Sequence, residues 1–288
     1  MKAIILAGGL GTRLDPITLA VSKQMLPIFD KPMIYYPLTT LMLAGIRDFV
    51  VISSSKFINS FKNLLGNGNQ WGISIEYVIQ KKPDGIASAF LLVSDFIKNE
   101  PVTLILGDNI FYGHNLAEPI TTAISNSNNH STIFSYRVRD PSNFGVVEFD
   151  QFNKPIKLIE KPSQTKSKYG ITGLYVYSKD VFDRVKQLSP SKRGELEITD
   201  LNKSYLKDNK LKVEILKRGV AWFDTGSFDS ILNASLFVST LEKRQGFKIA
   251  CPEEVAWRNG WLTDDELLKL SSKLNNYSLK SYLVELLD

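Results

Sequence analysis

The sequence contains very little cysteine and histidine, and this scarcity removes several kinds of site at once. Among 288 residues there is one cysteine, Cys251, and there are two histidines, His114 and His130. A single cysteine excludes an internal disulfide and a cysteine-rich zinc site. Two histidines are too few for the usual multi-histidine metal sites and weigh against a serine or cysteine triad. The chemistry of this chain is therefore expected to depend on other side chains.

Long apolar runs and blocks of like charge are also missing. No stretch approaches the roughly 18 uninterrupted apolar residues of a membrane span. The formal net charge is +5, but the Lys and Arg residues are scattered among Asp and Glu. Neither a membrane nor a nucleic acid is therefore expected as a partner. With 43% hydrophobic and 23% charged residues, the composition is that of an ordinary folded protein, expected to be cytoplasmic.

What the sequence does contain is an alternation of short apolar runs with amphipathic segments. In the first half, strand-like runs lie at residues 2–7, 49–53, 75–79 and 102–106, and helix-like segments lie at 33–44, 57–65, 86–97 and 116–125. Strands that alternate with helices form a largely parallel sheet covered on both faces. The pattern predicts an α/β fold.

The second half has a different pattern. Closely spaced strand-like runs lie at residues 132–138, 145–149, 155–159 and 172–177, so the sheet is expected to become mixed. Residues 228–244 and 264–287 have apolar positions three and four apart, as helices do. Because no low-complexity linker or repeat divides the chain, the simplest division is a main domain over residues 1–227 and a helical C-terminal lobe over residues 228–288.

A glycine-rich segment follows the first expected strand. Gly8, Gly9 and Gly11 lack the Cβ atoms that would keep backbone N–H groups away from a phosphate. The segment has neither the ending of a P-loop nor the glycine spacing of a dinucleotide-binding motif. Arg13 adds a cation suited to the charge on a leaving pyrophosphate. We expect this segment to hold a triphosphate; the alternative is a structural turn between a strand and a helix.

Two aspartates are candidates for binding magnesium. Asp108 follows a buried-looking strand, at the edge where α/β proteins bind ligands. Asp224 precedes a helix-like segment and is the second candidate, since Mg²⁺ takes one or two protein carboxylates and completes its octahedron with water and phosphate oxygens. Lys23 is a candidate for a second phosphate-binding cation. The alternatives are that Asp224 caps a helix and that Lys23 is a solvated surface residue.

Other segments offer groups for a second substrate and for a base. Glu160 could accept hydrogen bonds from sugar hydroxyls, and Lys161 could bind a sugar phosphate. Neighbouring residues of a strand point to opposite faces, so both meet one ligand only if the strand ends there, as Pro162 favours. Gln80 could bond a base edge, although the turn at residues 83–85 that follows it is by itself simply a loop.

Together these segments resemble the glucose-1-phosphate thymidylyltransferases over nearly the whole chain. The glycine loop alone is shared by the wider sugar nucleotidyltransferase superfamily, and the remaining motifs point to the thymidylyl branch. The resemblance implies a Rossmann-like, mixed and mainly parallel sheet flanked by helices, of the nucleotide-diphospho-sugar transferase type. It is carried by Leu-Ala-Gly-Gly-Leu-Gly-Thr-Arg-Leu from Leu6, Ser-Lys-Gln from Ser22, Asp-Lys-Pro-Met-Ile-Tyr-Tyr-Pro from Asp30, Gly-Asp-Asn-Ile-Phe-Tyr-Gly from Gly107, Arg-Gly-Glu-Leu-Glu-Ile-Thr-Asp from Arg193 and Cys-Pro-Glu-Glu from Cys251.

The resemblance also implies roles for individual residues. Mg²⁺ would be the cofactor, held by Asp108 and Asp224. The nucleotide would be bound by Gly8, Gly9, Gly11, Thr12, Arg13, Lys23, Gln24, Gln80, Gly85 and Asp108. The sugar phosphate would be bound by Asn109, Gly145, Glu160, Lys161, Thr172 and Arg193. The catalytic residues would be Arg13, Lys23, Asp108, Lys161 and Asp224.

Members of the family are homotetramers that dTDP-rhamnose inhibits at a separate subunit-interface site. Two residues depart from the family pattern: Asp15, where an aromatic residue is common, and Ser88, where a glutamine often follows Asp-Gly. Both are expected near the nucleotide, so base or sugar preference could differ. The candidates for the regulatory site are Gly113, Arg218, Glu254 and Arg258.

The resulting hypothesis is an in-line attack of glucose 1-phosphate on the α-phosphorus of dTTP, giving dTDP-glucose and diphosphate, the first step of dTDP-L-rhamnose and related deoxysugar synthesis. No protein nucleophile is needed, because the attacking phosphate is already an anion. One alternative is a sugar 1-phosphate nucleotidyltransferase that uses UTP, CTP or ATP. Another is a non-catalytic nucleotide-sugar sensor, whose expected sign would be loss of Asp108, Asp224 or Lys161.

Overall fold

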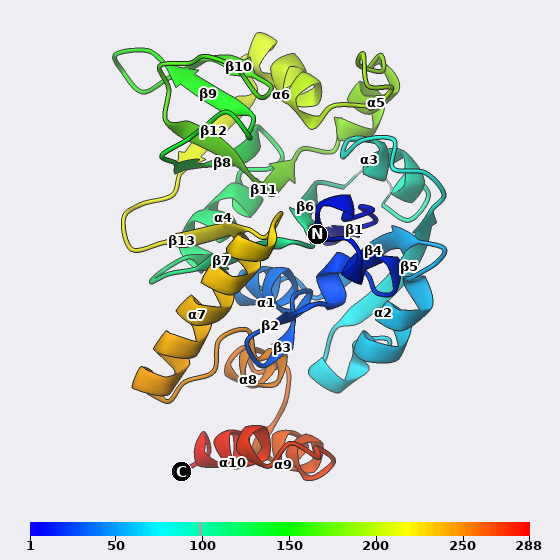
Figure 1. Ribbon diagram of the computed structural model, residues 1–288, viewed down its shortest axis with the longest axis vertical. Helices are drawn as coiled ribbons and strands as arrows, with labels where there is room; N and C mark the ends of the chain where they lie inside the picture. Colours follow the sequence, from blue (N-terminus) through cyan, green and yellow to red (C-terminus); the bar gives the residue numbers. More distant parts are fainter. Residues whose placement is uncertain (98–99) are drawn as a thin grey trace.

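The computed structural model describes residues 1–97 and 100–288, and a mixed sheet forms its centre (Figure 1). Within the described residues this sheet has nine strands. The order along its main path is β10-β9-β11-β6-β1-β4-β5; off this path, β8 pairs with β11 and β12 pairs with β8. The parallel part consists of β1 (Lys2–Ala7), β4 (Asp48–Ser54), β5 (Ser74–Gln80) and β6 (Val102–Leu106).

The second half of the sheet is mixed, as predicted. Strand β11 runs antiparallel to β6, β8 and β9, whereas β12 runs parallel to β8. Figure 1 shows this half at one end of the molecule, with β9 and β10 at its edge. Its strands are β8 (Ser131–Arg137), β9 (Val146–Phe149), β10 (Pro155–Ile159), β11 (Tyr169–Tyr177) and β12 (Leu211–Ile215).

Helices cover both faces of the sheet because its central strands are apolar on both sides. In β1, Ala3 and Ile5 belong to one buried cluster and Ile4 belongs to another. The alternation of side chains along a strand produces this division. The first cluster is covered by α1 (Tyr35–Leu43), α2 (Ile58–Leu65) and α4 (Ala117–Ser125), and the second by α3 (Ser88–Val93), α5 (Val181–Lys186) and α6 (Ile198–Lys207).

A two-stranded ribbon and a long helix form a third packed unit beside the sheet. Strands β7 (Asn109–Tyr112) and β13 (Ala221–Asp224) pair antiparallel, with Asp224 opposite Asn109. Helix α7 (Phe228–Gln245) starts just after β13 and packs on the short hairpin of β2 (Pro27–Ile28) and β3 (Lys31–Pro32). This unit therefore connects the segments that contain Lys23, Asp108 and Asp224.

The C-terminal helices lie at the end of the molecule opposite β9 and β10 (Figure 1). Helix α8 (Pro252–Arg258) packs against α1, while α9 (Asp264–Ser272) and α10 (Tyr277–Glu285) pack on each other. The predicted helical region 264–287 is thus two helices, because Asn276 caps a new start by accepting from the Leu279 N–H at 3.1 Å. No described helix is long and apolar enough to cross a bilayer.

Most predicted strands and helices are confirmed, but some elements lacked a sequence signal. The predicted helix over 86–97 is shorter, since α3 ends at Val93; residues 98 and 99 lie outside the described part. Strands β2, β3, β7, β12 and β13 and helices α5, α6 and α8 were not predicted. Asp224 ends β13, and the side chain that caps α7 belongs to Ser227.

Candidate active site

The glycine loop begins where β1 ends, at the carboxyl edge of the parallel strands. Gly11 has φ 65° and ψ 25°, a left-handed conformation that a side chain disfavours. Thr18 closes the loop by donating to the Gly11 carbonyl at 3.0 Å and to Asp15 Oδ1 at 2.7 Å. Asp15 therefore holds a turn beside the loop, and Gly9 and Gly11 line the adjoining cavity.

Lys23 and Asp108 form a partly buried ion pair across the site. The Lys23 ammonium donates to Asp108 Oδ2 at 2.5 Å, and the lysine side chain is only 9% exposed. The alternative, that Lys23 is a solvated surface residue, is therefore wrong. The Asp108 carbonyl also accepts hydrogen bonds from the Thr225 N–H at 3.2 Å and hydroxyl at 2.7 Å. The loop after β6 is thus joined directly to the end of β13.

Asp224 completes a charged cluster with these residues. Burial, assisted by the nearby charge of Asp108, raises its pKa to about 6, while Lys23, Arg13 and Lys161 oppose that rise. Two of these cations, Arg13 and Lys23, line the same cavity as the two carboxylates. Asp108 and Asp224 line a cavity of about 280 Å³ together with Gly9, Gly11, Thr12, Arg13, Leu14, Lys23, Gln24 and Gly226.

The two carboxylates fit a hard divalent cation. They are oxygen donors that repel each other, and a cation between them would relieve that repulsion. Among residues 1–97 and 100–288, no group of three or more Cys, His, Asp or Glu side chains is poised around a metal. A site with two carboxylates suits Mg²⁺, which takes its remaining ligands from water and phosphate.

A second set of predicted residues gathers at the end of β10. Thr199 donates a short hydrogen bond to Glu160 Oε2, and a Cβ on Gly145 would lie 3.4 Å from the same oxygen. Lys161 has φ 38°, so the chain leaves the strand alternation there, and its ammonium lies 3.8 Å from Glu160 Oε1. Strand β10 therefore ends at Ile159, just before Glu160, and both side chains can meet one ligand.

Gln80, one of the two residues expected near a base, packs against Gly8 of the glycine loop. Gln80 Oε1 occupies the space where a Gly8 side chain would be, since an added Cβ would lie 2.2 Å away. Gln80 Nε2 donates to Ser88 Oγ at 3.3 Å, and that hydroxyl donates to the Gly85 carbonyl at 2.7 Å. Ser88 thus connects Gln80 with Gly85, and the turn is more than a connecting loop.

Three expected site residues are bonded within the protein. Thr172 donates to the Phe134 carbonyl at 3.0 Å, and Gln24 accepts from the Ser22 hydroxyl at 2.6 Å. Arg193 forms a double hydrogen bond with Glu197, at 2.8 and 2.9 Å. The positive charge of Arg193 is therefore already paired with a carboxylate of its own segment.

Of the four candidates for a regulatory site, three gather in one cavity of about 280 Å³: Gly113, Glu254 and Arg258. Arg258 donates to Glu254 Oε1 at 2.7 Å. Arg218 lines a different cavity of about 410 Å³, and Asn115 and Leu116 line both. The two cavities are thus neighbours.

Two residues beside the site were not singled out by sequence reasoning. Thr199 holds Glu160, and the Trp222 indole N–H donates to Asn109 Oδ1 at 2.7 Å. Thr199 lies in the motif that starts at Arg193, and Trp222 lies two residues before Asp224. Their roles, however, depend on contacts between distant segments. A local pattern carries no signal for such contacts.

Comparison with known proteins gives a consistent assignment. Residues 2–240 match the nucleotidyl transferase family. The chain is 51% identical over 287 residues to a glucose-1-phosphate thymidylyltransferase from Neisseria meningitidis, covering 100% of this chain and 99% of that protein. It is 49% identical over 288 residues to the enzyme of that name from Mycolicibacterium smegmatis, with the same coverage.

Solved structures agree with the fold. A Bacillus anthracis structure in complex with sucrose, assigned to the same enzyme, superposes with a TM-score of 0.77 at 39% identity and covers 82% of this chain and 94% of that chain. A UDP-glucose pyrophosphorylase bound to UDP-glucose has a TM-score of 0.74 at 25% identity, over 85% of this chain and 99% of that chain. The mixed, mainly parallel sheet is therefore that of the nucleotidyltransferases.

Proposed function

This chain belongs to the glucose-1-phosphate thymidylyltransferase family of nucleotidyl transferases, and we propose that it joins dTTP to α-D-glucose 1-phosphate, releasing diphosphate. The product is dTDP-glucose. The observation that carries the proposal is the cavity beside the glycine loop, where Arg13 and Lys23 meet Asp108 and Asp224. An enzyme that brings two phosphate substrates together needs cations and positioned oxygen ligands of this kind.

The chain's own residues bind the nucleotide and stabilise the charge that moves. A phosphate oxygen of glucose 1-phosphate forms a bond with the α-phosphorus, and the bond from that phosphorus to the diphosphate oxygen breaks. The glycine-loop N–H groups and Arg13 hold the triphosphate and stabilise the departing diphosphate. Asp108 and Asp224 would hold Mg²⁺, which would act as a Lewis acid on phosphate oxygens. Lys23 holds the Asp108 carboxylate in place through their ion pair.

The second substrate would lie between this cavity and the end of β10. Glu160 would accept hydrogen bonds from the sugar hydroxyls. Lys161, whose positive charge acts to lower the pKa of Asp224, would bind the sugar phosphate. Gly145 gives the sugar room, because any side chain there would press on Glu160 and Thr199. Gln80 and Gly85 would bind the thymine. Catalysis then comes mainly from orientation and charge neutralisation.

The test is a screen of diphosphate release over dTTP, UTP, CTP and ATP, each with several sugar 1-phosphates. We expect dTTP with glucose 1-phosphate to give the highest kcat/KM. Equal or faster turnover with UTP would favour the alternative suggested by the UDP-glucose pyrophosphorylase fold. Absence of release with every pair would favour a non-catalytic sensor.

Asp108→Asn separates a catalytic role from a structural one. We expect kcat to fall about a hundredfold, as is typical when a key electrostatic group is lost. Asp183→Asn is the matched control, because Asp183 forms an ion pair with Lys186 on the exposed face of α5. Near-normal diphosphate release by the Asp108 variant would show that this residue takes no part in the mechanism. Undiminished activity in EDTA would show that the reaction needs no metal.

We further propose that the enzyme forms a homotetramer with residues 1–227 as its catalytic domain and 228–288 as a lobe for assembly and regulation. The cavity containing Gly113, Glu254 and Arg258 would bind dTDP-rhamnose as a feedback inhibitor, and Arg218 in the neighbouring cavity would contribute a cation. Inhibition that persists after Arg258→Ala would argue against this assignment.

A further inference from the structure

The Asn109 side chain is almost fully committed to contacts inside the protein. It is 1% exposed. Its Oδ1 accepts from the Gly173 N–H at 2.9 Å and from the Trp222 indole N–H at 2.7 Å, while its Nδ2 donates to Asp108 Oδ1 at 3.0 Å. If the amide group were rotated by half a turn, its NH₂ would face the N–H donors of Gly173 and Trp222 and could not bond to them. The NH₂ group must therefore face Asp108.

These contacts fix both oxygens of the Asp108 carboxylate. Asn109 holds Oδ1, and Lys23 holds Oδ2 at 2.5 Å. A carboxylate held by one donor on each oxygen cannot rotate freely about its last bond. Asp108 lines the same cavity as Asp224.

Strand β13 links the two metal-binding carboxylates. Trp222 and Asp224 are two residues apart in this strand and therefore lie on the same face. The register places Asp224 opposite Asn109, so Trp222 reaches Asn109 from the neighbouring diagonal position. The Trp222 ring is fixed in turn by Phe144, with ring centres 5.1 Å apart, and by Tyr136 at 5.8 Å. One strand thus supplies one carboxylate and orients the other.

Gly173 provides the space that this arrangement needs. A Cβ added at Gly173 would lie 2.7 Å from both Cγ and Oδ1 of Asn109 and 2.8 Å from Leu106 Cδ1. Any other residue at this position would push the Asn109 amide away from Asp108. The geometry is therefore built from three separate segments, β7, β11 and β13.

We propose that Trp222 and Asn109 are positioning residues for the divalent cation, acting through the orientation of the Asp108 carboxylate. The inference rests on the proposed function only in taking Asp108 and Asp224 as the metal ligands. Residues that hydrogen-bond to metal ligands typically change metal affinity or activity about 10–100-fold when they are replaced. Trp222 acts through one further hydrogen bond, so its effect belongs at the lower end of that range.

The test uses Trp222→Phe in the full-length protein, because phenylalanine keeps an aromatic ring at this position but has no N–H donor. Mn²⁺ binding to the protein without substrates is measured by electron paramagnetic resonance of the free ion. We expect the Mn²⁺ affinity to fall roughly tenfold. In turnover assays, the Mg²⁺ concentration for half-maximal rate should rise by a similar factor, with little change in KM for glucose 1-phosphate.

Trp257→Phe is the matched control, since its indole N–H donates to Asp264 Oδ1 at the same 2.7 Å but near the start of α9, away from the carboxylate pair. It should leave the Mn²⁺ affinity unchanged. Asn109→Ala should lower the affinity at least as much as Trp222→Phe, and adding Trp222→Phe to it should lower the affinity no further. Circular dichroism of each variant establishes that it is folded.

Three outcomes would overturn the proposal. The first is an unchanged Mn²⁺ affinity in folded Trp222→Phe. The second is a double variant whose loss of Mn²⁺ affinity equals the sum of the losses in the two single variants. The third is a wild-type protein that binds no Mn²⁺. Failure of the proposed reaction is distinguishable, because it would appear as absent turnover with dTTP while Mn²⁺ binding still depended on Trp222.

Discussion

At the scale of single residues, Gly85 lies in a turn after β5 whose flanking residues, Asp84 and Ala87, bond to the backbone of Leu196. Leu196 donates to the Asp84 carbonyl at 2.8 Å and accepts from the Ala87 N–H at 3.2 Å. Gly85 has φ 97°, and an added Cβ would lie 2.4 Å from the Leu196 carbonyl oxygen. A backbone atom cannot move aside as a flexible side chain can. We therefore expect Gly85→Ala to destabilise the protein by about 1–3 kcal/mol beyond the cost of its φ angle.

Gly219→Ala provides that reference. Gly219 has φ 92°, but an added Cβ meets nothing within 4 Å, so this variant measures the conformational cost alone. The free energy of unfolding of both variants is measured in urea. The difference between the two losses gives the effect of the contact between the added Cβ and Leu196. Equal losses of stability would mean that the Gly85 turn moves freely away from Leu196.

The raised pKa of Asp224 predicts a pH dependence of stability in the metal-free protein. The folded protein holds this proton more tightly than the unfolded chain, with a pKa of about 6 against 3.8. The stabilisation is therefore complete below about pH 4 and is lost as the pH rises through about 6. Asp224→Asn cannot titrate. In EDTA, the stability of wild type relative to this variant should fall by on the order of 2 kcal/mol between about pH 4 and pH 7; a constant difference would contradict the shift.

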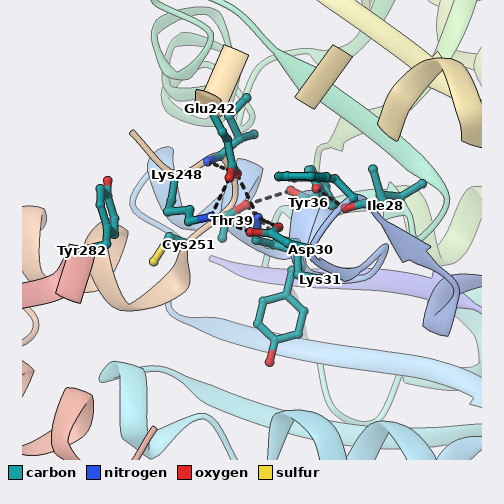
Figure 2. A network of polar contacts seen from close by, with 12 residues as sticks. Ile28, Asp30, Lys31, Tyr36, Thr39, Glu242, Lys248, Cys251 and Tyr282 are labelled. Carbon is teal, nitrogen blue, oxygen red and sulfur yellow. Dashed lines mark hydrogen bonds and ion pairs between the residues drawn. The ribbon is translucent and has the colours of Figure 1, made fainter. Parts of the chain in front are cut away.

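At the scale of elements, a cluster of four charged residues joins the end of α7 to the β2–β3 hairpin and to the segment before α8 (Figure 2). The cluster consists of Asp30, Lys31, Glu242 and Lys248. Glu242 is 4% exposed and accepts from Lys31 at 3.1 Å, from Lys248 at 2.8 Å and from the Ile249 N–H at 2.9 Å. Asp30 pairs with the same two lysines. Glu242→Gln leaves two ammonium groups with one carboxylate, so we expect a loss of about 3–5 kcal/mol in urea unfolding.

The exposed pair of Asp183 and Lys186, 3.4 Å apart on α5, is the control for this prediction. Asp183→Asn should change the free energy of unfolding by less than about 1 kcal/mol, because solvent screens surface pairs. If the two variants lost similar amounts of stability, the cluster would be no stronger than a surface pair.

The elements that could be predicted are those whose signal is local. The apolar run of β1 and the glycines after it are contiguous, so strand and loop were both predictable. Asn109 and Trp222 are 113 residues apart, and their contact depends on the pairing of two four-residue strands with weak patterns. For the same reason, the Thr199 hydroxyl could not be matched with Glu160, 39 residues away. Candidate ligands could thus be named from sequence, whereas the residues that hold them could not.

At the scale of the whole molecule, α7 presents an apolar face that no part of the described chain covers. Phe228, Leu232 and Leu236 are four residues apart and are 48%, 57% and 56% exposed. Residues at this spacing form one stripe along a helix. An aligned set of exposed apolar side chains is typical of an interface. We expect a second copy of this chain to cover the stripe in the proposed tetramer.

Light scattering after size-exclusion chromatography tests this arrangement. The wild-type protein should have a mass several times the 32.4 kDa of one chain, and Leu232→Glu with Leu236→Glu should lower it, because two charges would be buried at the interface. Leu268→Glu on α9 is the control, since Leu268 is 41% exposed outside the stripe. An unchanged mass in the double variant would place the subunit contacts on another face, and a wild type at the mass of one chain would contradict the tetramer itself.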